Sequence, residues 1–336
     1  MRLLPGAGLA AAVAAVATFL GGFVPALGAP LIAIVAGIAI AAWRPLPGPL
    51  GPGLGFTSKR VLQGSIVILG LNLSAREVLR SGRSSLPVLA GTLVLALAAA
   101  AVAGRLLRLR GDLNLLIGVG TAICGASAIA AADSVIDAEE ADVSYAIATI
   151  FTFNVVAVLA YPSLGHALGL SQHAFGLWAG TAVNDMSSVV AATTVYGHGA
   201  LSYGVVVKLT RTLAIIPICL GLAAWRHRRP AGAARSEPGP RPARAGRSLR
   251  RVFPLFILGF VAAVTLNSAG AVPASSHRGL GDLATWMITA ALAAIGLSTR
   301  PRAIRAAGAR PMILGAVLWF TVGVTSLALQ LASGQL

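Results

Sequence analysis

Charged residues are scarce in this sequence, and acidic residues are the scarcest of them. Only 11% of the 336 residues are Asp, Glu, Lys or Arg, whereas 57% are hydrophobic, and the mean hydropathy is +0.83. A soluble domain carries about 25% charged residues, so this composition excludes an ordinary soluble protein. Apolar segments long enough to cross a ~30 Å hydrocarbon core recur along almost the whole chain. We therefore expect an all-α polytopic membrane protein.

Cysteine and the usual catalytic motifs are also nearly absent. Cys124 and Cys219 fall in different apolar segments, and the sequence has no CxxC or other metal-ligand spacing. We therefore expect no disulfide, no metal and no cofactor. The sequence also lacks HExxH and GxSxG, whereas an intramembrane enzyme needs a nucleophile with its base or a set of metal ligands. An enzyme is accordingly not expected.

Eleven apolar segments are candidate spans, and ten is also compatible because several segments are short or rich in glycine. They comprise residues 7–25, 29–43, 61–75, 86–104, 113–133, 142–162, 174–196, 200–225, 251–268, 283–298 and 311–331. Residues 226–250 are rich in Arg, Pro and Gly and contain almost no apolar residue, which predicts a disordered cytoplasmic linker near anionic lipid. Residues 1–225 then form a transmembrane bundle that residues 251–336 complete.

The net charge of +16 is carried by short loops between apolar segments. Nucleic-acid binding is not expected, because these residues form no amphipathic or aromatic-interleaved surface. The positive-inside rule places loops 44–60, 105–112, 226–251 and 300–310 in the cytoplasm. Eleven spans then put the amino terminus inside, and the carboxyl terminus and the acidic segment 133–142 outside. The loop with Arg76, Arg80 and Arg83 conflicts with this scheme, because it would also lie outside.

One sixteen-residue pattern occurs twice, as residues 120–135 and again as residues 180–195. Glycine and small hydroxyl residues in mid-span continue a helix poorly, so each copy predicts an interrupted helix with freed backbone groups at membrane depth. Paired interrupted helices mark the binding site of secondary transporters. Seven of the sixteen positions are identical: Gly120/Gly180, Thr121/Thr181, Ala122/Ala182, Ser127/Ser187, Ala131/Ala191, Ala132/Ala192 and Val135/Val195.

A second repeat relates residues 70–91 to residues 296–315. In the eleven-span scheme these two segments run in opposite directions, as inverted-topology repeats require. The sixteen-residue repeat does not fit this scheme, because two intervening spans make its copies parallel. A re-entrant turn around residues 163–175 would make them antiparallel. A chance match between Ala-rich segments is the alternative.

Three ionisable residues lie inside apolar segments, namely Asp185, Lys208 and Arg211. Such residues persist in membranes where they face the protein interior and have a partner. Lys208 and Arg211 lie one helical turn apart on one face, so Asp185 neutralises only one of them and the surplus positive charge favours an anion. We hypothesise that Lys208 carries a coupling proton while Arg211 holds an oxyanion by two hydrogen bonds. The alternative is a static ion pair that locks two helices.

The interruptions also supply neutral donors, including backbone amides that suit an anion at a half-helix amino terminus. Cys124 either lines this site or fills a tight crossing. The complete candidate binding set is Thr121, Cys124, Gly125, Ser127, Thr181, Asn184, Asp185, Ser187, Ser188, Lys208 and Arg211.

Three ordered motifs, GTAICGASAIAA (120–131), FGLWAGTAVNDMSSVVAA (175–192) and VVVKLTRTLAIIP (205–217), resemble the YeiH-type family of sulfate exporters. The resemblance covers roughly residues 10 to 330. It implies a multi-pass secondary transporter of the bacterial inner membrane with crossed, broken helices. Met186 stands where that family usually has Thr, and Thr193 where it usually has Gly.

The expected function is export or exchange of a small anion, such as sulfate, sulfite, a sulfonate or a carboxylate, driven by a proton or sodium gradient. The alternatives are an anion channel, or a membrane sensor or enzyme that uses Cys124 or Asp185. No oligomeric state is predicted.

Overall fold

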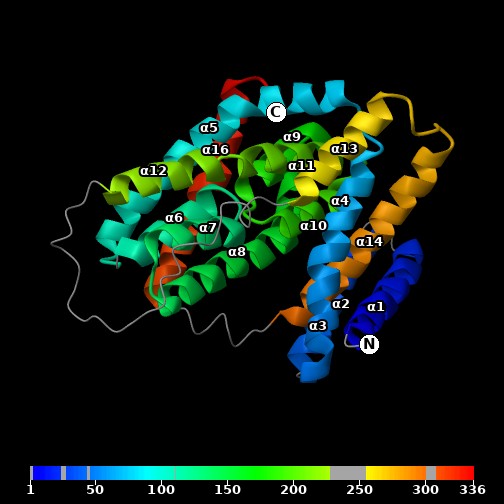
Figure 1. Cartoon of the computed structure of the whole chain (residues 1–336), viewed down its shortest axis with the longest axis horizontal. Helices are drawn as coiled ribbons and strands as arrows, with labels where there is room; N and C mark the ends of the chain where they lie inside the picture. Colours follow the sequence, from blue (N-terminus) through cyan, green and yellow to red (C-terminus); the bar gives the residue numbers. More distant parts are fainter. Residues whose placement is uncertain (1–2, 24–27, 44–45, 110, 228–254, 300–307) are drawn as a thin grey trace.

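The structure, a computed structural model, describes residues 3–23, 28–43, 46–109, 111–227, 255–299 and 308–336, and contains helices but no strand among them (Figure 1). The helices are α1 (Leu4–Phe23), α2 (Gly28–Trp43), η1 (Gly48–Leu50), α3 (Gly51–Phe56), the π-turn η2 (Thr57–Val61), α4 (Leu62–Gly70), α5 (Ala75–Leu106), α6 (Gly111–Ala122), α7 (Ala126–Ile136), α8 (Glu140–Ala167), α9 (Gln172–Ala182), α10 (Met186–Tyr196), α11 (His198–Thr212), α12 (Ile215–His227), α13 (Leu255–Ser268), α14 (Ser276–Ser298) and α16 (Ala309–Ala332).

The expected all-α polytopic architecture is confirmed. Among the described residues, six segments are long and apolar enough to cross a membrane: α1, α5, α8, α14, α16 and the segment His198–Trp225 that contains α11 and most of α12. Both copies of the sixteen-residue pattern lie in interrupted helices, as predicted, each divided into two half-helices of 11 or 12 residues. The predicted linker 226–250 lies almost entirely outside the described residues.

Two segments expected to be loops are helical. Residues 48–60 belong to the helical segment that continues into α4, so the third span begins well before residue 61. Arg76, Arg80 and Arg83 lie on the first turns of α5, which a capping box between Ser74 and Glu77 initiates. At 32 residues α5 is about 48 Å long, longer than the hydrocarbon core, so its first turns can reach the interface with their charges.

The helices form two lobes (Figure 1). Helices α1 to α4, α13 and α14 lie together in what we call the outer lobe, while α5 to α8, α12 and α16 form the hairpin lobe, with α9, α10 and α11 between them. Small residues permit close helix contacts in the outer lobe. A β-carbon on Gly296 of α14 would lie 3.0 Å from the Cα of Gly37 of α2.

Helices α9 and α10 form a hairpin and do not cross the membrane as one interrupted span. The outer ends of the two half-helices meet, because Gly199 N donates to the Gln172 side chain over 2.8 Å and the Phe175 and Tyr196 rings stack at 3.7 Å. The turn lies at the level of Asn154 in the middle of α8, whose side chain accepts from Asn184 N. We call this re-entrant pair hairpin 2.

Helices α6 and α7 form a matching hairpin, hairpin 1. A β-carbon on Gly120 of α6 would lie 2.9 Å from Ile129 of α7 and 3.3 Å from Ile150 of α8. The turn lies at Gly125, whose φ of +69° is a conformation that glycine adopts without strain. Because Gly104 of α5 packs against Asn114, hairpin 1 starts at the carboxyl end of α5.

The two hairpins enter from opposite sides, because α8 connects the end of hairpin 1 to the start of hairpin 2. Their sequence copies are therefore antiparallel, which removes the conflict with inverted repeats. Helices α5 and α16 are also antiparallel neighbours: Leu329 packs against Gly91, and Gln335 donates to Ser84 O. The prediction that loop 105–112 and the acidic segment 133–142 lie on opposite sides of the membrane is wrong. Because α7 turns back, this segment lies on the side where α5 ends, which we call the linker side.

Cysteine labelling tests this arrangement. In a Cys124→Ala/Cys219→Ala background, we expect Leu168→Cys and His198→Cys to react with an impermeant maleimide from the same side, and Glu140→Cys from the opposite side. All three positions are exposed. If hairpin 2 were a crossing span, positions 168 and 198 would react from opposite sides.

Candidate functional site

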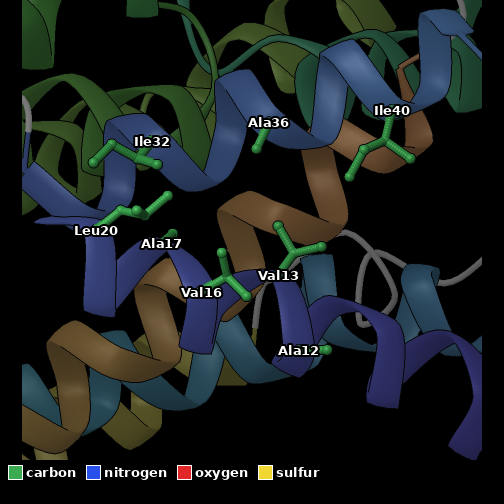
Figure 2. Close-up of a pocket in the computed structure, with 8 residues that line it drawn as sticks. All are labelled: Ala12, Val13, Val16, Ala17, Leu20, Ile32, Ala36 and Ile40. Atoms are coloured by element: carbon green, nitrogen blue, oxygen red, sulfur yellow. The ribbon is translucent and has the colours of Figure 1, made fainter.

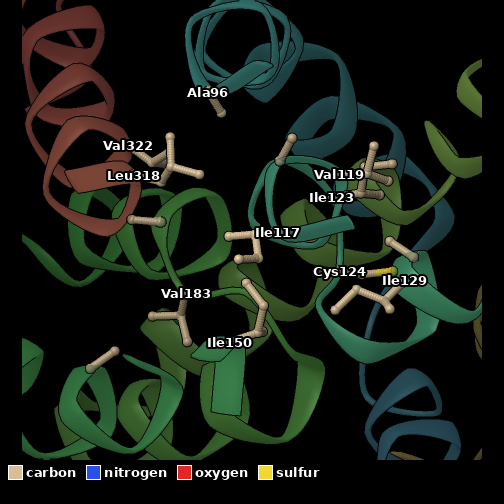
Figure 3. Packing of buried hydrophobic residues seen from close by; sticks show 14 of the residues in the cluster. Ala96, Ile117, Val119, Ile123, Cys124, Ile129, Ile150, Val183, Leu318 and Val322 are labelled. Atoms are coloured by element: carbon tan, nitrogen blue, oxygen red, sulfur yellow. The ribbon is translucent and has the colours of Figure 1, made fainter. Parts of the chain in front are cut away.

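The tips of the two hairpins meet at the boundary between the hairpin lobe and the central helices α9 to α11. A β-carbon on Gly125 would lie 3.5 Å from the Cβ of Asp185, so the backbones approach closely there. Apolar side chains pack around the tips, including Ile117, Ile123 and Val183 (Figure 3). Cys124 belongs to this buried cluster and is 7% exposed. Its thiol therefore packs within the buried contact between the two hairpin tips.

Lys208 and Arg211 of α11 bind the carbonyl groups that the interruptions leave free. Lys208 Nζ donates to Ile123 O over 2.9 Å and to Val183 O over 2.8 Å. Arg211 donates from Nε to Ala122 O and from Nη2 to Thr121 O, both over 2.8 Å, and from Nη1 to Thr181 O. Both side chains are buried, with 0% and 2% of their surface exposed.

The carbonyls that bind each cation are related by the sequence repeat. Lys208 joins residues 123 and 183, and Arg211 joins residues 121 and 181, and each pair is 60 positions apart. These carbonyls end the half-helices α6 and α9, where helix dipoles place partial negative charge. The two cations therefore lie where a pseudo-two-fold axis relates the hairpins, and they neutralise both carboxyl-terminal ends.

These contacts correct two expectations. Asp185 does not pair with Lys208 or Arg211, since no ion pair within 4.0 Å joins it to a described cation. Arg211 is not free to clamp an oxyanion, because all three guanidinium nitrogens donate to backbone carbonyls. The partners of both cations are main-chain oxygens, which side-chain charges in a sequence do not reveal.

Asp185 caps the amino terminus of α10. Its carboxylate accepts from the backbone N of Ser187 over 2.7 Å and of Ser188 over 3.3 Å, and from both serine hydroxyls. The positive end of the α10 dipole is thus neutralised within the protein. Asp185 and Ser187 are half-buried.

The equivalent position in hairpin 1, sixty residues earlier, is Gly125, which provides no side-chain cap for α7. Ala126 and Ser127 in the first turn are exposed. Of the two half-helices that begin at the junction, only α7 therefore presents an uncapped, accessible amino terminus. Backbone N–H groups and a serine hydroxyl at such an end are suited to an anion.

The remaining predicted residues lie on the buried side of the junction. Thr181 Oγ1 contacts Ser326 Oγ of α16 at 2.6 Å, whereas Thr121 Oγ1 and Asn184 Oδ1 are buried without a hydrogen-bond partner. Asn154 of α8 and Ser326 of α16, which hold hairpin 2, were not predicted from the sequence. The only feature of the sequence that could have indicated these two residues is that each is a single polar residue within an apolar span.

A separate pocket between α1 and α2 is lined only by apolar side chains: Ala12, Val13, Val16, Ala17, Leu20, Ile32, Ala36 and Ile40 (Figure 2). It offers no side-chain donor or charge to an anion. It lies in the outer lobe, away from the hairpin tips. The hairpin junction is therefore the stronger candidate site.

Comparison with known proteins relates this chain to a family of membrane proteins. Residues 5–315 match the model of a family described as "Conserved hypothetical protein 698". A UPF0324 membrane protein of Streptococcus pyogenes serotype M6 is 40% identical over 99% of this chain and 98% of its own length. The chain belongs to the UPF0324 family.

Other UPF0324 membrane proteins are similar to this chain over nearly its whole length. One from Streptococcus pneumoniae serotype 4 is 41% identical over 94% of this chain and 93% of its own, and one from Streptococcus agalactiae serotype V is 38% identical over 98% of both chains. Their names describe membrane proteins, and the chain is accordingly a multi-pass membrane protein. The resemblance of its motifs to YeiH-type proteins is confirmed at the level of the family.

Removing the Arg211 side chain should destabilise this UPF0324 protein. Arg211→Ala leaves the carbonyls of residues 121, 122 and 181 without their donor, and each unsatisfied buried group costs about 1–3 kcal/mol. We expect Tm in detergent to fall by about 5 °C or more. Arg83→Ala, at an exposed position on α5, is the control and should leave Tm unchanged. Equal melting of wild type and Arg211→Ala would contradict the carbonyl-anchor role.

Proposed function

We propose that this protein is a secondary transporter of a small anion such as sulfate, sulfite, a sulfonate or a carboxylate, which it exports or exchanges. The observation that carries the proposal is the pair of inverted hairpins whose tips meet inside the bundle. Half-helices that end at membrane depth in inverted repeats form the substrate sites of secondary transporters. The family relationship supports a multi-pass membrane protein.

The anion binds at the amino terminus of α7 in this proposal. The backbone N–H groups of Ala126 and Ser127 and the hydroxyl of Ser127 are its donors, and the helix dipole adds partial positive charge. Hairpin 2 provides an internal comparison, because the Asp185 carboxylate binds the corresponding backbone and hydroxyl groups of α10. The substrate anion takes at α7 the place that this carboxylate takes at α10.

Lys208 and Arg211 act indirectly. They hold the carboxyl ends of α6 and α9 together and so fix the position of the α7 amino terminus. Their two full charges also make the surrounding potential more positive, and burial reduces its screening by salt. The anion is attracted by these cations without replacing their carbonyl ligands.

Flux in proteoliposomes tests the function. The purified protein is reconstituted and screened with sulfate, sulfite, taurine and acetate for saturable uptake, and for counterflow in which internal unlabelled anion accelerates uptake of external labelled anion. A carrier gives both. Flux that does not saturate and shows no counterflow indicates a channel, and chemical conversion of the anion indicates an enzyme. Either result, or no flux with any anion, would overturn the proposal.

The Ser127 hydroxyl should contribute to anion affinity. A hydrogen bond to a charged group is worth about 1.5–3 kcal/mol, so Ser127→Ala should raise KM for the transported anion roughly tenfold or more. Ser134→Ala is the matched control, because Ser134 is exposed two turns further along α7 and donates to its own helix at Ala131 O. An equal KM for Ser127→Ala and Ser134→Ala would exclude the α7 amino terminus as the binding site.

A further inference from the structure

We propose that Asp185 binds the coupling proton, and that it does so together with the anion. This inference rests on the proposed function and specifies its driving ion. It replaces the hypothesis that Lys208 carries the proton. The protein then transports one proton with each anion, in the same direction.

Lys208 is poorly placed for proton exchange. Its ammonium group is fully buried and donates to carbonyls of both hairpins. A coupling group must exchange its proton with water on one side and then on the other. Lys208 could reach water only if the carbonyl contacts that hold both hairpin tips were broken.

Asp185 meets the requirement that Lys208 does not. Its side chain is half-buried, and no described cation lies within ion-pair distance of it. It caps α10 through a carboxylate that also contacts the Ser187 and Ser188 hydroxyls. Hydroxyl groups donate to an ionised carboxylate and accept from a protonated one, so these two serines can stabilise both states.

Few ionisable groups face Asp185 from the elements packed around it. Lys208 of α11 interacts with it electrostatically beyond ion-pair distance, and Cys124 lies at the tip of hairpin 1. The α8 group at this level is the neutral amide of Asn154. Helix α2 has no ionisable residue, and those of α14 lie in its first two turns, ahead of the part that packs against α10. Asp185 is thus the acid at the junction.

The position of Asp185 links the proton to the anion. The Asp185 Cβ lies 3.5 Å from where a β-carbon of Gly125 would be, so an anion at the α7 amino terminus is close to the carboxylate. Two neighbouring negative charges repel each other in a partly buried site. Protonation of Asp185 removes the repulsion, so proton and anion each favour binding of the other.

The proton balance is simple. Asp185 takes a proton from water on the side where the anion binds, and the carboxylic acid returns it to water on the side where the anion leaves. No bond within the anion changes.

Asp185→Asn tests the coupling in reconstituted protein, because asparagine keeps the shape and one acceptor oxygen but cannot exchange a proton. With an anion that the wild type exchanges, we expect the variant to retain counterflow at equal pH on both sides and to lose accumulation driven by a pH gradient. At pH values at which Asp185 is ionised, the affinity of the wild type for the anion should fall about tenfold for each further pH unit. The affinity of the variant for the anion should not change with pH. At high pH the variant should bind on the order of 100-fold more tightly than the wild type.

A second measurement does not depend on the variant. A pH-sensitive dye should report uptake of about one proton per anion bound to the wild-type protein in weak buffer. Absence of this uptake, accumulation driven by a sodium gradient alone, or pH-driven accumulation in Asp185→Asn would each overturn the inference. Absence of any anion exchange by the wild type would instead overturn the proposed function.

Discussion

Two buried cations bound to backbone carbonyls hold the centre of this protein together. Half-helices that end inside a membrane leave carbonyl groups with no water to bind, and each unsatisfied group costs several kcal/mol. Lys208 and Arg211 supply donors and positive charge to the ends of both α6 and α9. The hairpins can therefore stop and turn back at membrane depth, and every other feature of the candidate site depends on that turn.

The two hairpins are equivalent at their carboxyl-terminal ends and different at the amino-terminal ends that follow. Carbonyls of residues 121 and 181 bind the same guanidinium, whereas Gly125 and Asp185 occupy equivalent positions with different chemistry. The repeat thus provides one helix end that is capped internally and one that is open. A symmetrical framework holds both ends side by side, and the difference between Gly125 and Asp185 is the basis of the anion and proton sites that we propose.

The sequence predicted the fold class, the two interruptions and the residues that meet there, because glycine and hydroxyl residues in apolar spans are visible in the sequence. It did not show that the interrupted helices turn back, because a crossing helix and a re-entrant hairpin have the same composition and periodicity. The direction depends on the backbone at Gly125 and on contacts far apart in the chain, such as Gln172 with Gly199. Residues 48–56 were predicted to be a loop because they are rich in glycine. In the structure this glycine lets α3 pack closely against α1, where Gly53 faces Gly6.

The two equivalent half-helices α7 and α10 differ in how far the rest of the protein covers them. An exposed face extends along α7 from the junction to the linker side and comprises Ser127, Ala130, Ser134 and the C-cap residue Asp137. The equivalent face of α10 contains Ser187, Val190 and Thr194, where Val190 is fully buried in a cluster with α2 and α14 of the outer lobe. In the transport cycle that we propose, this exposed face of α7 gives the linker side access to the junction. The proposed cycle also needs the opposite state, with α7 covered and α10 exposed. Because α10 packs against the outer lobe, we expect the hairpin lobe to move against that lobe to reach it.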